Sequence, residues 1–228
     1  MTYSMPSFTR LLQGVNGVNY RTISRNGTLS TTITICGEIN QTRQRFTIRK
    51  SFKKTVAYYR FAQGRSARTS FVIVDAQSVK TTDLTKNSGY DGGKKISGIK
   101  RHMAVDINGL PQAVLVTRAN VSDRSGALAM FISLASQNLE LVQHVMVDGG
   151  YTGNDFADQV KLILNAKTTV AKRNELHTFT VLPQRWIIER SWSWLDKCRR
   201  LWKNCERALN SSLQMVVLAF LKIVLKRY

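Results

Sequence analysis

Two short apolar runs, each ending at an aspartate, constrain the fold of this chain more than any other feature of its sequence. Residues 71–74 are Phe-Val-Ile-Val and lead into Asp75, and the run from Leu141 to Val147 leads into Asp148. Short runs rich in β-branched residues are typical of buried strands. Functional groups of α/β sheets gather just beyond the carboxyl ends of neighbouring strands, so we expect the two carboxylates to lie close together.

The surrounding patterns alternate between strands and helices. The Asn108-Gly109 pair between two apolar runs predicts a β-hairpin. The expected ranges are 100–107 and 110–117 for the hairpin, 168–172 for a further strand, and 123–136, 155–162, 184–200 and 213–226 for helices. This order predicts an α/β fold with a mixed sheet flanked by helices.

The N-terminal segment differs from the rest of the chain in composition and in hydrophobic pattern. Residues 11–50 are rich in Thr, Asn, Gly and Arg and show almost no sustained hydrophobic periodicity. We therefore divide the chain into an irregular segment, residues 1–68, and a folded α/β domain, residues 69–228.

The chain is strongly basic. Lys and Arg number 34 against 14 Asp and Glu, which gives a net charge of +20. A charge of this size repels itself unless a polyanion balances it, so nucleic acid is the first partner to expect. On charge alone, generic RNA binding is an equally good interpretation.

Other compositional features exclude several classes of protein. The three cysteines form no CxxC pair and the three histidines are scattered, which argues against structural zinc and disulfides and fits a reducing cytoplasm. Residues 1–10 lack the apolar core of a secretion signal, and the run 213–225 is too short and too charged to span a bilayer. We expect a cytoplasmic protein without a membrane partner.

The aspartates at the two strand ends suggest a metal site. Two adjacent carboxylates repel each other unless a proton or a cation lies between them, and oxygen-only ligands favour Mg²⁺ or Mn²⁺ over zinc. Taken singly, either aspartate could instead be an ordinary turn or cap residue. Glu189 shares a helix face with Arg185, four residues earlier, and could equally form a surface ion pair.

Five segments together resemble a known family. They are VDAQSVK at 74–80, GYDGGKK at 89–95, KRH at 100–102, DGGY at 148–151 and RWIIER at 185–190. In this order they resemble the bacterial DDE transposases of the insertion-sequence-five-like group, from about Phe71 to the C-terminus. The resemblance implies an RNase H-like core with the catalytic and metal-binding triad Asp75, Asp148 and Glu189.

The resemblance also implies a reaction. Mg²⁺, or Mn²⁺ in its place, would support DNA strand cleavage and strand transfer at insertion-sequence ends by two-metal phosphoryl transfer. Asp75 would contact both ions, and neither Ser78 nor Tyr151 would act as a nucleophile. The implied partners are double-stranded DNA, at the element's ends and at the target, and a second copy of the chain in a homodimer. No small-molecule substrate is implied, and the bacterial nucleoid is the implied location.

Several basic residues are candidates for DNA contacts. A cluster before the hairpin would hold phosphates, although it could also be a solvated loop. Arg185 matches the first Arg of the family's signature helix, and Lys197 follows Asp196, which stands at the position of the family's Lys. Trp194 and Trp202 are expected in the core. The full set of candidate DNA contacts is Lys94, Lys95, Lys100, Arg101, Arg185, Lys197, Arg199 and Arg200.

The first residues do not resemble the helical DNA-binding region of full-length relatives. With suitable codons, residues 13–33 read two nucleotides later become a peptide that resembles the family's own N-terminal segment. We therefore interpret about residues 11–36 as an out-of-frame remnant of a DNA-binding region. Alternatives to an active transposase are a decayed copy that only binds DNA, and an RNase H-like nuclease that cuts without joining.

Overall fold

The computed structural model describes residues 39–82, 87–135, 141–171 and 184–226. The chain divides into two units, Met1–Thr42 and Arg43–Tyr228. Of the first unit only residues 39–42, in the first turn of a helix, are described. The proposed out-of-frame stretch 11–36 lies outside the described residues.

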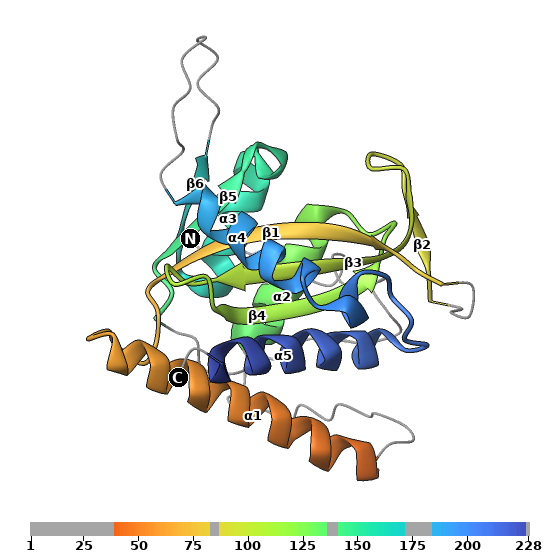
Figure 1. Cartoon of the computed structure of the whole chain (residues 1–228). Helices are drawn as coiled ribbons and strands as arrows, with labels where there is room; N and C mark the ends of the chain where they lie inside the picture. The colour runs from red at the N-terminus through yellow and green to blue at the C-terminus, as the bar shows by residue number, and fades with distance from the viewer. Residues whose placement is uncertain (1–38, 83–86, 136–140, 172–183, 227–228) are drawn as a thin grey trace. The chain divides into compact units, whose positions relative to one another are not determined.

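A mixed sheet forms the centre of this unit (Figure 1). Its strands are β1 Phe71–Lys80, β2 Gly89–Asp91, β3 Ile96–Val105, β4 Pro111–Arg118, β5 His144–Asp148 and β6 Lys167–Ala171. The order is β2-β3-β1-β5-β6. The short β2 pairs with residues 96–98 of β3, and β4 pairs with residues 99–105 of the same strand. Strand β1 is antiparallel to β3 and parallel to β5, which is parallel to β6. The expected mixed α/β sheet is confirmed.

Helices cover both faces of the sheet. They are α1 Ile39–Ala62, α2 Asp123–Ala135, α3 Asn154–Leu164, α4 Arg185–Asp196 and α5 Leu209–Leu225, with the short 3-10 helices η2 Gly149–Tyr151 and η3 Arg199–Leu201. No helix among the described residues is long and apolar enough to cross a membrane.

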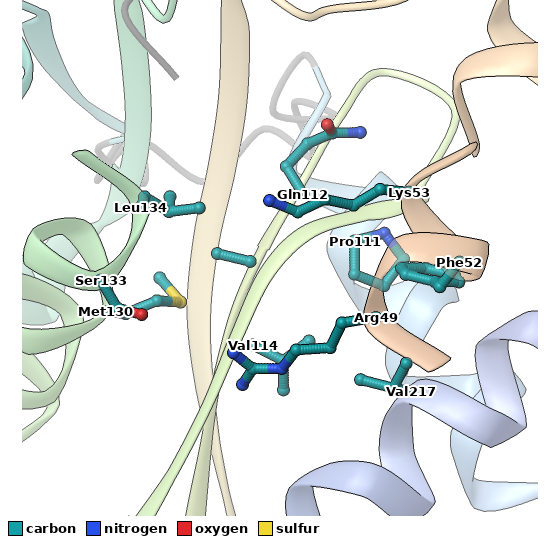
Figure 2. A pocket seen from close by; sticks show the side chains of 11 residues that line it. Arg49, Phe52, Lys53, Pro111, Gln112, Val114, Met130, Ser133, Leu134 and Val217 are labelled. Atoms are coloured by element: carbon teal, nitrogen blue, oxygen red, sulfur yellow. The ribbon is translucent and has the colours of Figure 1, made fainter. Parts of the chain in front are cut away.

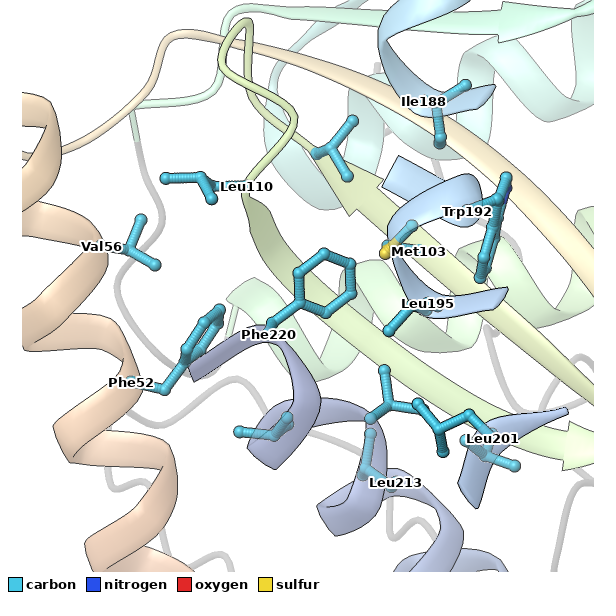
Figure 3. Packing of buried hydrophobic residues seen from close by; sticks show 14 of the residues in the cluster. Phe52, Val56, Met103, Leu110, Ile188, Trp192, Leu195, Leu201, Leu213 and Phe220 are labelled. Atoms are coloured by element: carbon cyan, nitrogen blue, oxygen red, sulfur yellow. The ribbon is translucent and has the colours of Figure 1, made fainter. Parts of the chain in front are cut away.

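The alternation of β1 divides the core into two clusters, because successive strand residues point to opposite faces. Val72 and Val74 pack with α2 and α3, while Ile73 packs with α4 and α5. Figure 3 shows the cluster that contains Ile73, with Phe220 of α5 and Leu195 of α4 among its side chains. The side chains of Ile73 and Asp75, two residues apart, point to the same face of the sheet. Helix α4 covers that face.

Strand β1 is longer than its apolar run. It continues through Asp75 to Lys80, so the expectation that the strand ends just before Asp75 is wrong. The physical reason is the neighbouring strand: Asp75 is paired with Met103, and the ladder runs on to Lys80 opposite Gly98. Asp148 is likewise the last residue of β5 and does not follow it.

Helix α1 lies within the segment 1–68, where no helix was expected. Phe52 and Val56, one turn apart, are buried in the core cluster of α4 and α5. One turn further, Arg60 forms a buried ion pair of 2.5 Å with Asp106 at the end of the β3–β4 hairpin. The second half of α1 is thus part of the packed unit.

Candidate active site

Asp75 and Asp148 lie on adjacent parallel strands. The ladder pairs Phe71 with His144 and Ile73 with Met146, and the same register carried two residues further sets Asp75 opposite Asp148. Neighbouring strands lie roughly 5 Å apart, and residues in matching register point to the same face. Both carboxylates therefore belong to the face covered by α4.

Asp75 is held by a side chain of α4. The indole Nε1–H of Trp192 donates a hydrogen bond of 2.9 Å to Oδ2 of Asp75. Burial raises the pKa of Asp75 above its ordinary value, the charge of Asp148 raises it further, and the hydrogen bonds from Trp192 and the Ala76 N–H oppose the shift. A carboxylate in this setting gains strongly from a nearby cation.

Asp148 ends β5 and caps the short helix η2. Its carboxylate accepts a hydrogen bond of 2.9 Å from the Gly150 N–H. An added Cβ at Gly149 would meet no atom of the described residues within 4 Å. Asp148, Gly149 and Gly150 line a hollow together with Ala171 and Arg185. Space for a ligand therefore lies directly beside the Asp148 carboxylate.

Glu189 reaches this region through Arg185. The Arg185 guanidinium lies 3.8 Å from Oδ2 of Asp148 and 3.5 Å from Oε1 of Glu189, whose side chain is 63% exposed. Among the described residues, no three His, Cys, Asp or Glu side chains lie close enough together to hold a metal ion. The structure thus brings Asp75 and Asp148 to facing positions and leaves Glu189 paired with an arginine.

Comparison with known proteins identifies the family. Residues 66–223 match the family described as the transposase DDE domain. The chain belongs to this family. It is also 30% identical over 116 residues to the putative transposase for insertion sequence element IS402 of Burkholderia cepacia. That match covers 48% of this chain and 54% of the relative, so the chain spans about half the length of the curated relative it matches.

The basic cluster of this transposase DDE domain is largely internal. Lys100 and Arg101, expected to contact DNA, are only 5% and 1% exposed. The Lys100 ammonium lies 2.7 Å from Asp123 and 3.2 Å from Asp91, and Arg101 donates to the Leu201 carbonyl at 3.0 Å. We correct the expectation for both residues: their charges are engaged inside the protein, where a phosphate cannot reach them.

Lys94 and Lys95 differ from this buried pair. Lys95 is exposed at the β2–β3 turn, in a left-handed conformation with φ of 52°. The Lys94 ammonium donates to the Ala76 carbonyl at 3.0 Å and lies 3.8 Å from Asp123. Its charge also lowers the pKa of Asp75, though less than the other influences do. Lys94 therefore lies close to the carboxylate pair as well as at the surface.

Asp91 anchors the turn that carries these lysines. Its carboxylate accepts hydrogen bonds from the Ser78 hydroxyl at 2.6 Å and from the backbone N–H of Gly93 and Lys94. Burial alone would raise the pKa of Asp91, but these hydrogen bonds and the Lys100 ammonium lower it to about 2. Ser78 lies inside β1, and its hydroxyl fixes Asp91 of β2.

The region after α4 presents charge and an aromatic ring to solvent. Lys197, Arg199 and Arg200 are exposed, and Trp202, which was expected in the core, is 75% exposed. Trp194 is half-buried and packs against the core cluster of α4 and α5. The helix expected to reach residue 200 ends at Asp196.

Two residues near the carboxylates were not predicted from the sequence. The indole N–H of Trp192 donates to Asp75. Tyr151 is 1% exposed, and its hydroxyl has no hydrogen-bond partner among the described residues. Burial raises the pKa of Tyr151, and the charges of Asp75, Asp123 and Asp148 raise it further. The sequence signal that could have placed Tyr151 near the carboxylates is its position directly after Asp148-Gly149-Gly150.

A second hollow lies away from these carboxylates, among α1, β4, α2 and α5 (Figure 2). Arg49 and Lys53 border it together with apolar side chains such as Phe52 and Met130. Burial lowers the pKa of Arg49 and of Lys53. None of the described residues that line this hollow carries a carboxylate, so the hollow lacks the acidic ligands with which Mg²⁺ is usually bound.

Proposed function

We propose that this chain carries the catalytic domain of an insertion-sequence transposase that cleaves DNA at the element's ends and joins the cut strands to a target. One observation supports this most: β1 and β5 are adjacent and parallel, in a register that sets Asp75 opposite Asp148 when it is continued two residues past Ile73 and Met146. Arg185 of α4 lies near both Asp148 and Glu189. Membership of the transposase DDE family suggests which reaction these two carboxylates support.

The side chains present fit a hard divalent cation. The donor set is all oxygen, as Mg²⁺ and Mn²⁺ prefer. The half-buried carboxylate of Asp75 has a raised pKa and repels Asp148, so a cation beside both would relieve an existing electrostatic cost. Glu189 would join them once Arg185 releases it. When bound, Mg²⁺ ions neutralise charge on the attacking and leaving oxygens of a phosphoryl transfer.

The chain's own groups would orient the reaction. Trp192 fixes Oδ2 of Asp75, and the Gly150 N–H fixes one oxygen of Asp148. Arg185 would exchange its two carboxylate partners for the phosphate of the DNA, because a guanidinium recognises both with the same planar donors. The hollow beside Asp148 would admit that phosphate.

We further propose double-stranded DNA as the substrate and a homodimer as the working form, because two element ends must be joined together. Residues 69–228 would form the RNase H-like catalytic domain, with the second half of α1 packed on it. Lys94, Lys95, Arg185, Lys197, Arg199 and Arg200 are the DNA contacts that remain in this proposal. The N-terminal segment would supply end recognition where its reading frame is intact.

The test uses the full chain with labelled duplexes that carry the element's terminal sequences, together with a supercoiled target plasmid. With Mg²⁺ we expect strand cleavage followed by transfer of label to the plasmid, and no reaction in EDTA. Asp75→Asn, Asp148→Asn and Glu189→Gln should each abolish both steps. Asp158→Asn, which changes an exposed acidic residue of α3, is the matched control and should react normally.

Different failures have different meanings. Cleavage without transfer would favour a nuclease of the same fold. DNA binding without cleavage would indicate a decayed copy. Cleavage that survives all three triad substitutions would refute the proposed site.

A further inference from the structure

The connector between α4 and α5, residues 198–207, is fixed to the sheet although little of it is regular structure. Asn204 forms a bridge with Thr81: its N–H donates to the Lys80 carbonyl at 2.8 Å, and its own carbonyl accepts from the Thr82 N–H at 3.0 Å. Its side chain accepts from the Ser212 hydroxyl of α5. Arg101 binds the Leu201 carbonyl from β3. The backbone of the connector is therefore held from three sides.

Trp202 stands out from this fixed backbone. It is 75% exposed and is the most exposed large hydrophobic side chain among the described residues, while the preceding Leu201 is 5% exposed. An indole of this exposure contributes little to the core of the protein. Rigidly presented tryptophans are enriched where proteins bind partners, since their large area is ordered at a low entropic cost.

The surroundings of Trp202 indicate an anionic partner. The Lys203 ammonium lies 5.5 Å from the centroid of the indole ring. The one acidic residue of the connector, Glu206, is paired with Arg200 at 2.6 Å. The exposed basic residues in and beside the connector are Lys197, Arg199, Arg200, Lys203 and Arg207. Cations bind the phosphates of a nucleic acid, and an exposed indole can stack on a base whose face is accessible. The surroundings of Trp202 offer both kinds of contact.

We propose that the connector binds single-stranded DNA, with Trp202 stacked on the face of one base and the neighbouring cations on the phosphates. Stacking on an aromatic ring needs a base whose face is free, which the interior of a duplex does not offer. This inference rests on the proposed function, because it takes DNA as the partner, and it adds an unpaired stretch of that DNA as a ligand. Lys203 strengthens the stack as a cation over the ring.

The location of the connector suits a strand held at the catalytic carboxylates. The bridge at Thr81 lies six residues beyond Asp75, directly after the end of β1. At a rise of about 3.3 Å per residue, the separation is roughly 20 Å. One turn of duplex DNA is about 34 Å long, so the distance from Asp75 to the point where the connector joins the sheet is shorter than a single turn.

The experiment measures binding of the full chain to two fluorescent oligonucleotides of equal length in EDTA: an oligothymidylate, and a strand of abasic sites with the same phosphates. We expect the wild type to bind the oligothymidylate at least about tenfold more tightly than the abasic strand. Trp202→Ala should remove that preference and leave abasic affinity nearly unchanged, whereas Trp202→Phe should keep most of it. Phe61→Ala is the control, since Phe61 is 74% exposed on α1.

Equal binding of both strands by the wild type, or an unchanged preference in Trp202→Ala, would overturn the inference. The inference would also be overturned if Trp202→Ala differed from the wild type in molar mass, measured by light scattering, and not in base preference. That result would assign Trp202 to contact with a second copy. Because the assay contains no divalent metal, its result does not depend on Asp75, Asp148 or Glu189. A wild type that shows base preference but no cleavage would count against the proposed function alone.

Discussion

The indole N–H of Trp192 donates a hydrogen bond of 2.9 Å to Oδ2 of Asp75 and so connects α4 to the carboxylate in the middle of β1. Trp192 is 7% exposed and packs in the core cluster of α4 and α5, so its ring cannot turn freely. The hydrogen bond therefore orients the Asp75 carboxylate. Partners of this kind tune the affinity of metal sites, and their removal typically costs about 10- to 100-fold.

Trp192→Phe should weaken Mn²⁺ binding by about 10- to 100-fold, because the ring remains packed while the donor to Asp75 is lost. Isothermal titration with Mn²⁺ measures this directly. Trp186→Phe, which changes a more exposed indole on the same helix, should bind Mn²⁺ as the wild type does. Equal Mn²⁺ affinity in Trp192→Phe and the wild type would show that the hydrogen bond has no part in the site.

Asp75→Asn should raise the melting temperature in EDTA at pH 7 while reducing cleavage by about a thousandfold or more. Burial raises the pKa of Asp75 above 3.8, so the folded state holds this proton more tightly than the unfolded chain. The protein then loses stability as pH rises from 3.8 through the pKa of Asp75 in the folded state. The uncharged amide of Asp75→Asn avoids that loss. Differential scanning calorimetry in EDTA checks the sign; a lower melting temperature at pH 7 would contradict it.

Arg185→Gln should affect metal and DNA in opposite directions. The guanidinium lies within 4 Å of Asp148 and Glu189, so its removal frees both carboxylates and should tighten Mn²⁺ binding. Cleavage should fall by about a hundredfold, because the phosphate loses its positioning group. The control Lys161→Ala removes an exposed cation of α3 and should alter neither property. Weaker Mn²⁺ binding in Arg185→Gln would argue against competition between Arg185 and the metal.

His102 should make the protein acid-sensitive. Burial lowers the pKa of His102 from 6.5 to about 4, with its Nε2 2.9 Å from the Thr117 hydroxyl. The folded state resists the proton that the unfolded chain accepts, so stability is complete above pH 6.5 and falls by roughly 3 kcal/mol as pH drops to 4. His102→Gln should flatten this part of the stability profile in urea unfolding. An unchanged slope between pH 6.5 and 4 would exclude His102 as its cause.

Arg60→Ala should lower the free energy of unfolding by about 3–5 kcal/mol, because it leaves Asp106 charged, buried and without its partner. Urea unfolding measures the loss, and Arg65→Ala, on an exposed residue, provides the comparison. A loss no larger than that of Arg65→Ala would mean that the second half of α1 does not belong to the packed unit.

Local signals predicted the parts of the fold that depend on neighbouring residues. The Asn108-Gly109 pair does form the hairpin turn, with Gly109 at a φ of 79°. Strand β1 beyond Asp75 could not be predicted, because Gln77 and Ser78 are polar and become strand only by pairing with β3. Helix α1 was missed for a similar reason: its buried Arg60 depends on Asp106, far along the chain.

Burial of charged and aromatic residues was the hardest part of the site to predict. Lys100 and Arg101 resemble surface cations until Asp91, Asp123 and the Leu201 carbonyl are brought around them. Trp202 shows the opposite case, since a tryptophan is expected inside and the fixed connector places it outside. The facing positions of Asp75 and Asp148 follow from their strand patterns, whereas the pairing of Glu189 with Arg185 leaves its place in a metal site a prediction.

The most direct test of the proposed metal site is anomalous diffraction from crystals of the full chain soaked in Mn²⁺. We expect Mn²⁺ between the carboxylates of Asp75 and Asp148, with Glu189 turned from Arg185 toward the metal. Crystals saturated with Mn²⁺ that show no anomalous peak beside these two aspartates, with Glu189 still bound to Arg185, would contradict the account.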